Sequence, residues 1–409
     1  MSGAAAAELL LSLLLVPLIP ALVDIIPSIR ARRGHVFPIP QDHRSLEDFT
    51  VLVPIYGNVK YLENVDYLRP YGSRVTLVTT CSETAEFNEA LDAIAGENAF
   101  SVFRTVVARH AAAGKRQTAG TIRDQIIRDA TEFVSTGYVV CIDADTVTDR
   151  PLGELVGALE ANNLDLASVK LVPSNTNRLL GRLQAHEYHM VMRLRRVLPF
   201  VCSGACQVAR SEALREVMRR HSLFFQGNDV ELGLLGDALG YRVGFLTFVV
   251  PTTVPDRLRP WLRQRIAWAG GEFRLFIVNP QLVIRHPFYA FYGGVVVILL
   301  VPLRWINMEK PGLGLASMFV LYWLVVLAVN WRQRDWSLLV YPFYGLFISL
   351  VLVPIGLLSY FQMAIPERNW GRIRRGHLHR RRPRPRSRQE VGGATPKETQ
   401  RPGWAPAFD

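Results

Sequence analysis

Cysteine is scarce in this chain, which has four cysteines among 409 residues. Their number and irregular spacing exclude a disulfide scaffold, and Cys202 and Cys206 lack the further cysteine or histidine partners that a zinc site needs. We therefore expect free thiols, as in a reducing cytosolic environment.

Basic residues are absent before the first apolar run, which covers residues 9–23. A cleaved signal peptide carries positive charge ahead of its apolar core, whereas here Glu8 precedes the run and arginines follow it from Arg30. The positive-inside rule places those arginines in the cytoplasm. The sequence therefore predicts an uncleaved N-terminal membrane anchor over residues 1–30.

Three further apolar runs, at residues 287–303, 312–331 and 338–363, approach or exceed the length of about 17–25 residues that crosses a bilayer. Trp and Tyr residues lie at their edges, as interfacial anchors do. Three buried core helices are the alternative. The pattern predicts a multi-pass plasma-membrane protein with two or three C-terminal transmembrane helices within residues 284–364, and the run at 287–303 is expected to cross incompletely.

Positive charge is concentrated at the C-terminus. Residues 367–409 contain eleven Arg and one Lys against four acidic residues, so they carry most of the net charge of +12. Such a segment cannot build a core, and we expect residues 365–409 to be a disordered Arg-rich tail. After membrane segments, the expected partner of this tail is anionic membrane lipid and not nucleic acid.

The middle of the chain, residues 45–283, alternates short apolar runs with helical patterns, which predicts an α/β domain with a mostly parallel sheet. Strands are predicted at residues 49–54, 74–79, 138–142 and 167–172, and helices at 123–133 and 179–198.

Two carboxylates, Asp143 and Asp145, directly follow the predicted strand at residues 138–142. Open α/β sheets bind ligands beyond the carboxyl ends of their strands. Mg²⁺ is usually held by one or two carboxylates together with substrate phosphates. The position therefore favours a divalent cation bound with a diphosphate, and two solvated acids at a strand end are the alternative.

Several further motifs follow in order along the same domain. They are Val-Pro-Ile-Tyr-Gly-Asn at 53–58, Gly-Lys-Arg-Gln at 114–117, Cys-Ser-Gly-Ala-Cys at 202–206, Gly-Asn-Asp-Val-Glu-Leu at 227–232 and Gln-Arg-Ile-Ala-Trp at 264–268. Together with Asp-Ala-Asp at 143–145, this set resembles the processive family 2 glycosyltransferases, which include chitin, hyaluronan and cellulose synthases. The resemblance implies a GT-A domain on the cytoplasmic side, a nucleoside-diphosphate sugar donor (a UDP-sugar in this family) and Mg²⁺ or Mn²⁺.

The resemblance also assigns roles at the donor site. It implies that Asp145 ligates the metal, that Asp143 binds the metal or the donor ribose, and that Lys115 and Arg116 contact the diphosphate. For Lys115 and Arg116 the alternative is a solvated basic turn.

On the acceptor side, Asp229 resembles the catalytic base that removes the proton of the acceptor hydroxyl. Its alternative role is an acid favoured by the dipole at a helix N-terminus. Gln264 and Arg265 are implied to reach the diphosphate, and Trp268 to stack on an acceptor sugar or else to pack in the core. Glu231 is expected on the helix surface.

Three positions depart from the family pattern. Glu83 is the only acid near the end of the second strand, where a carboxylate pair is usual, Asn228 stands where an acid commonly precedes the base, and Ala267 replaces an Arg. These departures concern recognition of the nucleotide base and affinity for the donor. The missing Arg alone would remove a contact to phosphate that contributes about 1.5–3 kcal/mol.

The resemblance and the apolar runs together predict a membrane-embedded, inverting glycosyltransferase. It would extend a growing saccharide on the cytoplasmic face and pass the product outward. Two alternatives remain open: transfer to a lipid acceptor, as in ceramide glucosyltransferases, and a degenerate, non-catalytic membrane scaffold.

Overall fold

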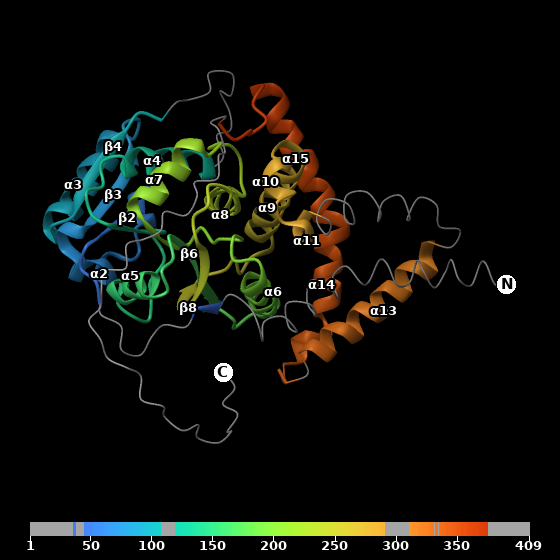
Figure 1. The fold of residues 1–409 in the computed structure, drawn as a ribbon. Helices are drawn as coiled ribbons and strands as arrows, with labels where there is room; N and C mark the ends of the chain where they lie inside the picture. Colours follow the sequence, from blue (N-terminus) through green and yellow to red (C-terminus); the bar gives the residue numbers. More distant parts are fainter. Residues whose placement is uncertain are drawn as a thin grey trace, which may run out of the picture.

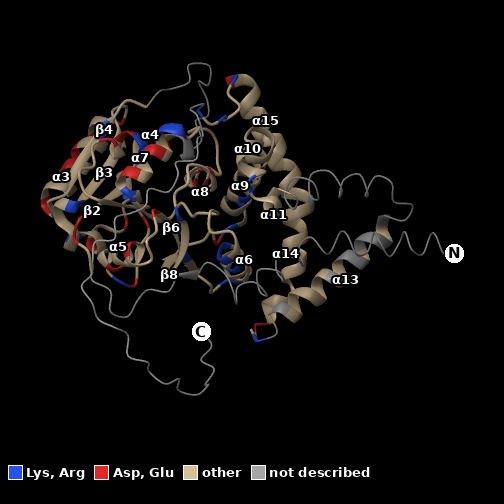
Figure 2. Ribbon diagram, viewed as in Figure 1, with Lys and Arg blue, Asp and Glu red and all other residues tan. Residues whose placement is uncertain are grey.

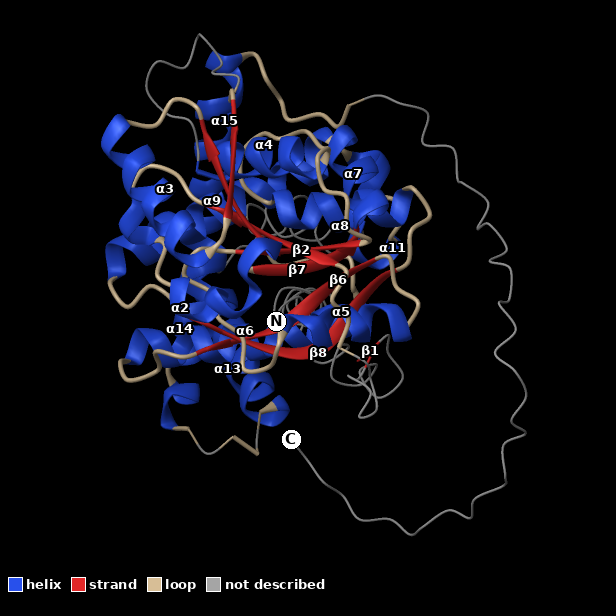
Figure 3. Cartoon of the chain, turned by 90° about the vertical axis from the view of Figure 1, so that its left-hand side faces the viewer, coloured by secondary structure: helices blue, strands red, loops and turns tan. Residues whose placement is uncertain are grey.

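An eight-stranded, mostly parallel sheet with helices on both faces forms the centre of the computed structural model (Figures 1 and 3). The structure describes residues 36–37, 45–107, 119–290, 311–330, 332–333 and 335–374. The strand order is β1-β8-β6-β7-β5-β2-β3-β4, and β7 alone runs antiparallel to its neighbours β5 and β6. The predicted α/β class with a mostly parallel sheet is confirmed. The strands are β1 (Val36–Phe37), β2 (Phe49–Pro54), β3 (Val75–Thr80), β4 (Ser101–Thr105), β5 (Tyr138–Ile142), β6 (Leu166–Pro173), β7 (Cys206–Arg210) and β8 (Val243–Thr252).

The helices fall into those that cover the sheet and those that follow it. The first group is α2 (Val65–Leu68), α3 (Ala85–Asn98), α4 (Ala119–Thr131), α5 (Leu152–Ala161), α6 (Leu179–Val197), α7 (Ser211–Arg220) and α8 (Asn228–Ala238). The second is α9 (Leu258–Val278), α10 (Pro280–Val283), α11 (Pro287–Tyr289), α13 (Pro311–Val329), α14 (Tyr341–Phe347) and α15 (Val353–Glu367). A π-helical turn, Ile348–Leu352, joins α14 to α15.

The core consists of two apolar layers, one on each face of the sheet. Alternating residues of a strand enter different layers: Val51 and Val53 pack with α3 and α5, whereas Leu52 packs with α4, α7 and α8. Because both faces are covered, β5 is buried along its whole length and β2 at every residue except Thr50, as parallel strands usually are. The central strands are continuous apolar runs in the sequence because side chains on both faces of the sheet are covered.

The carboxyl ends of β2, β3 and β5 meet at one edge of the sheet, because these strands are parallel neighbours. β7 runs the other way, so its first residue, Cys206, pairs with Ile142 at that same edge. The backbone N–H of Asp143 donates to the carbonyl of Ala205 at 2.9 Å. The loop before β7 is thereby attached to the end of β5.

α15 packs along α9 at very short range (Figure 1). A Cβ on Gly356 would lie 2.6 Å from the Cβ of Ala269, so the two helices need glycine at this crossing. One face of α14, the π-helical turn and α15 is apolar and exposed, although Phe347 stacks on Trp261 of α9 and Phe343 packs on Phe319 of α13. This face consists of Phe343, Phe347, Val351, Ile355, Leu358 and Ile365, which we call the apolar stripe. Figure 2 shows no charged residue on α14 and none on α15 before its end.

No helix in the part of the chain that the structure describes is both long and apolar enough to cross a bilayer. The predicted anchor over residues 1–30, most of the run at 287–303, and residues 375–409 of the predicted tail lie outside the described residues. Residues 369–374 are described, and Ile373 is buried against the core of the α/β domain. Membrane insertion therefore stays a prediction.

Candidate functional site

Asp143 and Asp145 lie where predicted, at the carboxyl end of β5. Asp145 is exposed, and its carboxylate accepts a hydrogen bond from the hydroxyl of Thr146 at 3.2 Å. The buried amide of Asn64 donates to the backbone carbonyls of Asp143 and Thr146, at 3.0 and 2.7 Å. This amide holds the turn that presents both carboxylates above the sheet edge.

Arg123, on α4, is a central residue of the site that the sequence did not reveal. Its Nε donates to Oδ1 of Asp143 at 3.0 Å, and its Nη2 donates to the carbonyl of Gly204 at 2.6 Å. Burial raises the pKa of Asp143, Arg123 lowers it, and the charge of Asp145 raises it again; the net shift is upward. The guanidinium thus connects the end of β5 to the loop before β7.

Asp229 lies in the first turn of α8, as expected from the sequence. Gly227 precedes the helix with φ of +80°, a conformation that favours glycine, and a Cβ there would lie 3.1 Å from the backbone of Gly271. Oδ2 of Asp229 lies 3.9 Å from the Cβ position of Gly204. The structure therefore brings Asp143, Arg123 and Asp229 together around the Gly204 loop.

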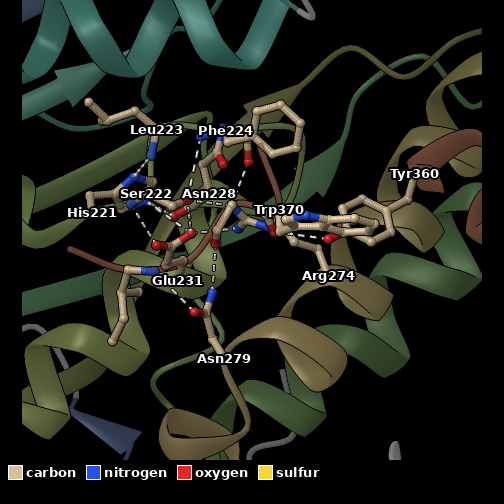
Figure 4. A network of polar contacts seen from close by, with 12 residues as sticks. His221, Ser222, Leu223, Phe224, Asn228, Glu231, Arg274, Asn279, Tyr360 and Trp370 are labelled. Atoms are coloured by element: carbon tan, nitrogen blue, oxygen red, sulfur yellow. Dashed lines mark hydrogen bonds and ion pairs between the residues drawn. The ribbon is translucent and has the colours of Figure 1, made fainter. Parts of the chain in front are cut away.

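Glu231, two residues further along α8, is fully buried, so its predicted place on the helix surface is wrong. Its Oε2 pairs with Nη2 of the equally buried Arg274 at 2.6 Å (Figure 4). Ser222 donates to both carboxylate oxygens, from its N–H and its hydroxyl, at 2.7 Å each. Burial raises the pKa of Glu231, but Arg274, His221 and the Ser222 hydrogen bonds outweigh it and hold the pKa below its usual value.

The same network reaches the chain beyond α15 (Figure 4). Asn279 donates to the carbonyl of Gly371 and accepts from the N–H of Ile373, both at 3.0 Å. On the other side, the Nε2 of His221 bonds the carbonyl of Asn228 at 2.9 Å. His221 and Ser222 before α8, together with Arg274 on α9, therefore hold the first turn of α8. Asn279 attaches the chain after α15 to the end of α9.

Arg265 and Trp268 form a stacked pair on α9. The guanidinium carbon of Arg265 lies 4.3 Å from the centroid of the Trp268 ring, and the Trp268 side chain is 39% exposed, which excludes a core role. Arg265 is buried and donates to Glu187 at 2.6 Å and to Gln264 at 2.8 Å. In this state the guanidinium of Arg265 serves intramolecular contacts, so diphosphate binding by Gln264 and Arg265 stays a prediction.

Lys115 and Arg116 lie outside the described residues. Glu83, the acid that follows β3, accepts from the N–H of Gly57 at 3.2 Å and so links the loops after β2 and β3. All four cysteines are free, as predicted.

Substitution of Trp268 by Ala tests the exposed ring as a sugar platform. We expect the KM for a saccharide acceptor to rise about tenfold, because covering a large apolar side chain contributes about 1.5–3 kcal/mol. The KM for the donor should stay within about twofold, since Arg265 keeps its ion pair with Glu187. Initial rates at varied donor and acceptor concentrations measure both, and equal losses for the two substrates would contradict a platform role.

The model of the glycosyl transferase family group 2 matches residues 138–362, which is more than half of the chain. The chain belongs to this family. The match begins at β5 and includes the strand end, α8 and the motif on α9, so it covers most of the site described above.

Curated relatives match over shorter stretches. An N-acetylglucosaminyltransferase of Azorhizobium caulinodans is 30% identical over 152 residues, which is 33% of this chain and 38% of that protein. A hyaluronan synthase of Streptococcus pyogenes is 25% identical over 256 residues, which is 56% of this chain and 61% of that protein. The matches thus span less than two thirds of these relatives. A solved mannosyltransferase from Pyrobaculum calidifontis, in complex with GDP-Man and Mn²⁺, aligns with a TM-score of 0.45 at 16% identity, over 87% of this chain and 97% of that one.

Proposed function

We propose that this protein is an inverting glycosyltransferase that moves a sugar from a nucleoside-diphosphate sugar to a growing saccharide. The observation that carries the proposal is the position of Asp229 beside the Gly204 loop, which Arg123 ties to Asp143. Direct displacement at the anomeric carbon needs a carboxylate close to the acceptor hydroxyl and a separate place for the departing diphosphate. Asp229 supplies the first, and the end of β5 supplies the second.

Asp145 and Asp143 would hold Mg²⁺ or Mn²⁺ at the end of β5. Their carboxylate oxygens suit a hard cation, and the exposed Asp145 is the freer of the two because Arg123 already binds Asp143. Among the described residues no cluster of three or more His, Cys, Asp or Glu side chains is placed to bind a metal. The donor phosphates would therefore complete the coordination, and the cation would neutralise charge on the leaving diphosphate. Lys115 and Arg116 are proposed to contact the same group.

UDP-N-acetylglucosamine is the first donor to test. The sugar is suggested by the N-acetylglucosaminyltransferase relative, and the UDP group by the donors that the motif resemblance implies. A saccharide acceptor is supported by the exposed ring of Trp268, which offers a flat apolar face.

We further propose that the apolar stripe on α14 and α15 contacts membrane lipid. The protein would be a multi-pass plasma-membrane protein with its α/β domain in the cytoplasm, and it would pass the product outward. The stripe follows one helical face over more than twenty residues, and its side chains are exposed, although Phe347 also stacks on Trp261 of α9 with 6.2 Å between the ring centroids. A lipid-linked acceptor is the second candidate, because α14, which carries part of the apolar stripe, also contacts the Arg265 site. The hydroxyl of Tyr344 on α14 donates to Glu187, the partner of Arg265. Partition of labelled product into organic solvent or water separates the two acceptors.

The test of the metal is a release assay in detergent with UDP-N-acetylglucosamine. We expect EDTA to stop UDP release and Mn²⁺ or Mg²⁺ to restore it. Substitution of Asp145 by Asn should raise the Mn²⁺ concentration for half-maximal rate about tenfold or more, the scale for disturbing a metal site. Asp66→Asn, an exposed acid on α2, is the matched control and should behave as wild type. Undiminished release in EDTA would refute a metal-dependent reaction.

A further inference from the structure

A small cavity lies directly beneath Asp229, between α4, α7 and α8. Its polar walls are formed by Arg123, Asp124, Gln207, Asn228 and Asp229. The cavity has about 10 Å³, which is the room that one water molecule needs. None of the residues that the resemblance implicates in sugar transfer, other than Asp229, contributes to it.

Two buried oxygen atoms on these walls have no hydrogen-bond partner. They are Oδ2 of Asp124 and Oδ1 of Asn228, and these residues are 5% and 8% exposed. Buried polar atoms in folded proteins are nearly always satisfied by protein or by ordered water. Both atoms are acceptors, so neither satisfies the other, and each needs a donor that the described protein atoms do not supply.

One water molecule meets this requirement because it donates twice. A metal cation is disfavoured, since the guanidinium of Arg123 lies 3.6 Å from the other oxygen of Asp124. Burial raises the pKa of Asp124 to about 6, His221 and Arg123 lower it, and the charge of Asp229 raises it, which places Asp124 and Asp229 in one electrostatic environment.

We propose that Asp124 and Asn228 hold a single water molecule beneath Asp229, and that Asp124 is a positioning residue for this base. The inference rests on the proposed function, in which Asp229 accepts the acceptor proton. Asn228 is the first residue of α8, and its backbone carbonyl is already bonded to His221. With its side chain held through water to Asp124, the first turn of α8 is fixed from both sides, and the Asp229 carboxylate keeps one orientation.

An exchange of the two side chains tests the proposal. Asp124→Asn alone should lower kcat about tenfold and leave the KM for UDP-N-acetylglucosamine within about twofold, because a displaced base affects the chemical step. The double variant Asp124→Asn with Asn228→Asp returns one carboxylate and one amide to the cavity, and its kcat should recover to within about threefold of wild type. Asp129→Asn, on the same helix but outside the cavity, is the control and should leave kcat unchanged.

Full activity of Asp124→Asn would overturn the proposal, as would a double variant no faster than the single one. A high-resolution crystal structure supplies a readout that does not depend on turnover. It should show one water within hydrogen-bond distance of both Asp124 and Asn228 in wild type, and an empty cavity would refute the site. If the wild type released no UDP, the proposed function would fail while the water site would still be decided by the crystal structure.

Discussion

Substitution of Asp229 by Asn is expected to lower kcat for sugar transfer about a hundredfold or more, the usual scale for loss of a general base. The amide keeps the size of the side chain and its place at the start of α8, where Gly227 and Gly271 set the backbone. Donor binding should change little, because Asp143, Asp145 and Arg123 are untouched. Steady-state rates with varied donor give kcat and KM separately.

Asp237→Asn is a matched control for this substitution. Asp237 lies on the same helix, near its end, and its half-exposed carboxylate faces His286 at 3.3 Å. We expect rates within about twofold of wild type, because surface substitutions away from a site have small effects. A variant of Asp229 that loses donor affinity and kcat in equal measure would indicate a structural role for this residue instead.

The second large effect concerns folding and not chemistry. Substitution of Arg274 by Met leaves the carboxylate of Glu231 buried without its cation, and should lower the free energy of unfolding by about 3–5 kcal/mol. The loss is expected to be large because both side chains are fully buried and because Arg274 also donates to Ser222 and to the carbonyl of Phe224. Urea titration followed by tryptophan fluorescence measures it, and a change below about 1 kcal/mol would contradict the network's role.

The same pair makes a signed prediction for pH. The folded-state pKa of Glu231 lies below its unfolded value, so the pair stabilises the fold above the unfolded pKa, and the stabilisation disappears as pH falls through the folded pKa. We expect wild-type stability to decline below about pH 4.3, the ordinary value for Glu. Glu231→Gln should flatten that decline, whereas the exposed Glu89→Gln should not.

The parallel core of the fold is predictable from the sequence because its strands are continuous apolar runs. β2 and β5 have the predicted bounds, and β3 and β6 differ from theirs by one residue at each end. β7 was not predicted, since its sequence, Cys206 to Arg210, follows a glycine-containing motif that reads as a loop. β4 lies at the edge of the sheet and is partly exposed, so it lacks the apolar run that revealed β2, β3, β5 and β6. β8 (Val243–Thr252) was also not predicted.

The residues of the site also divide into those that local sequence patterns predict and those that they do not. Asp143, Asp145 and Asp229 were found because a strand end and a helix start leave local patterns in the sequence. Arg123 and Glu231 were not, because their roles depend on partners brought close only by folding: Arg123 meets Gly204 across 81 positions, and Glu231 meets Arg274 through a helix packing that no local pattern encodes.

The most direct test of sugar transfer with Asp229 as the base is UDP release from UDP-N-acetylglucosamine by the purified protein. Release is measured with and without a chitin-oligosaccharide acceptor, for wild type and for Asp229→Asn. We expect manganese-dependent release that rises with acceptor, a product longer by one or more sugars, and a loss of about a hundredfold in the variant. Equal rates for wild type and Asp229→Asn, or no release with any nucleotide sugar in a donor screen, would contradict this expectation and favour a non-catalytic scaffold.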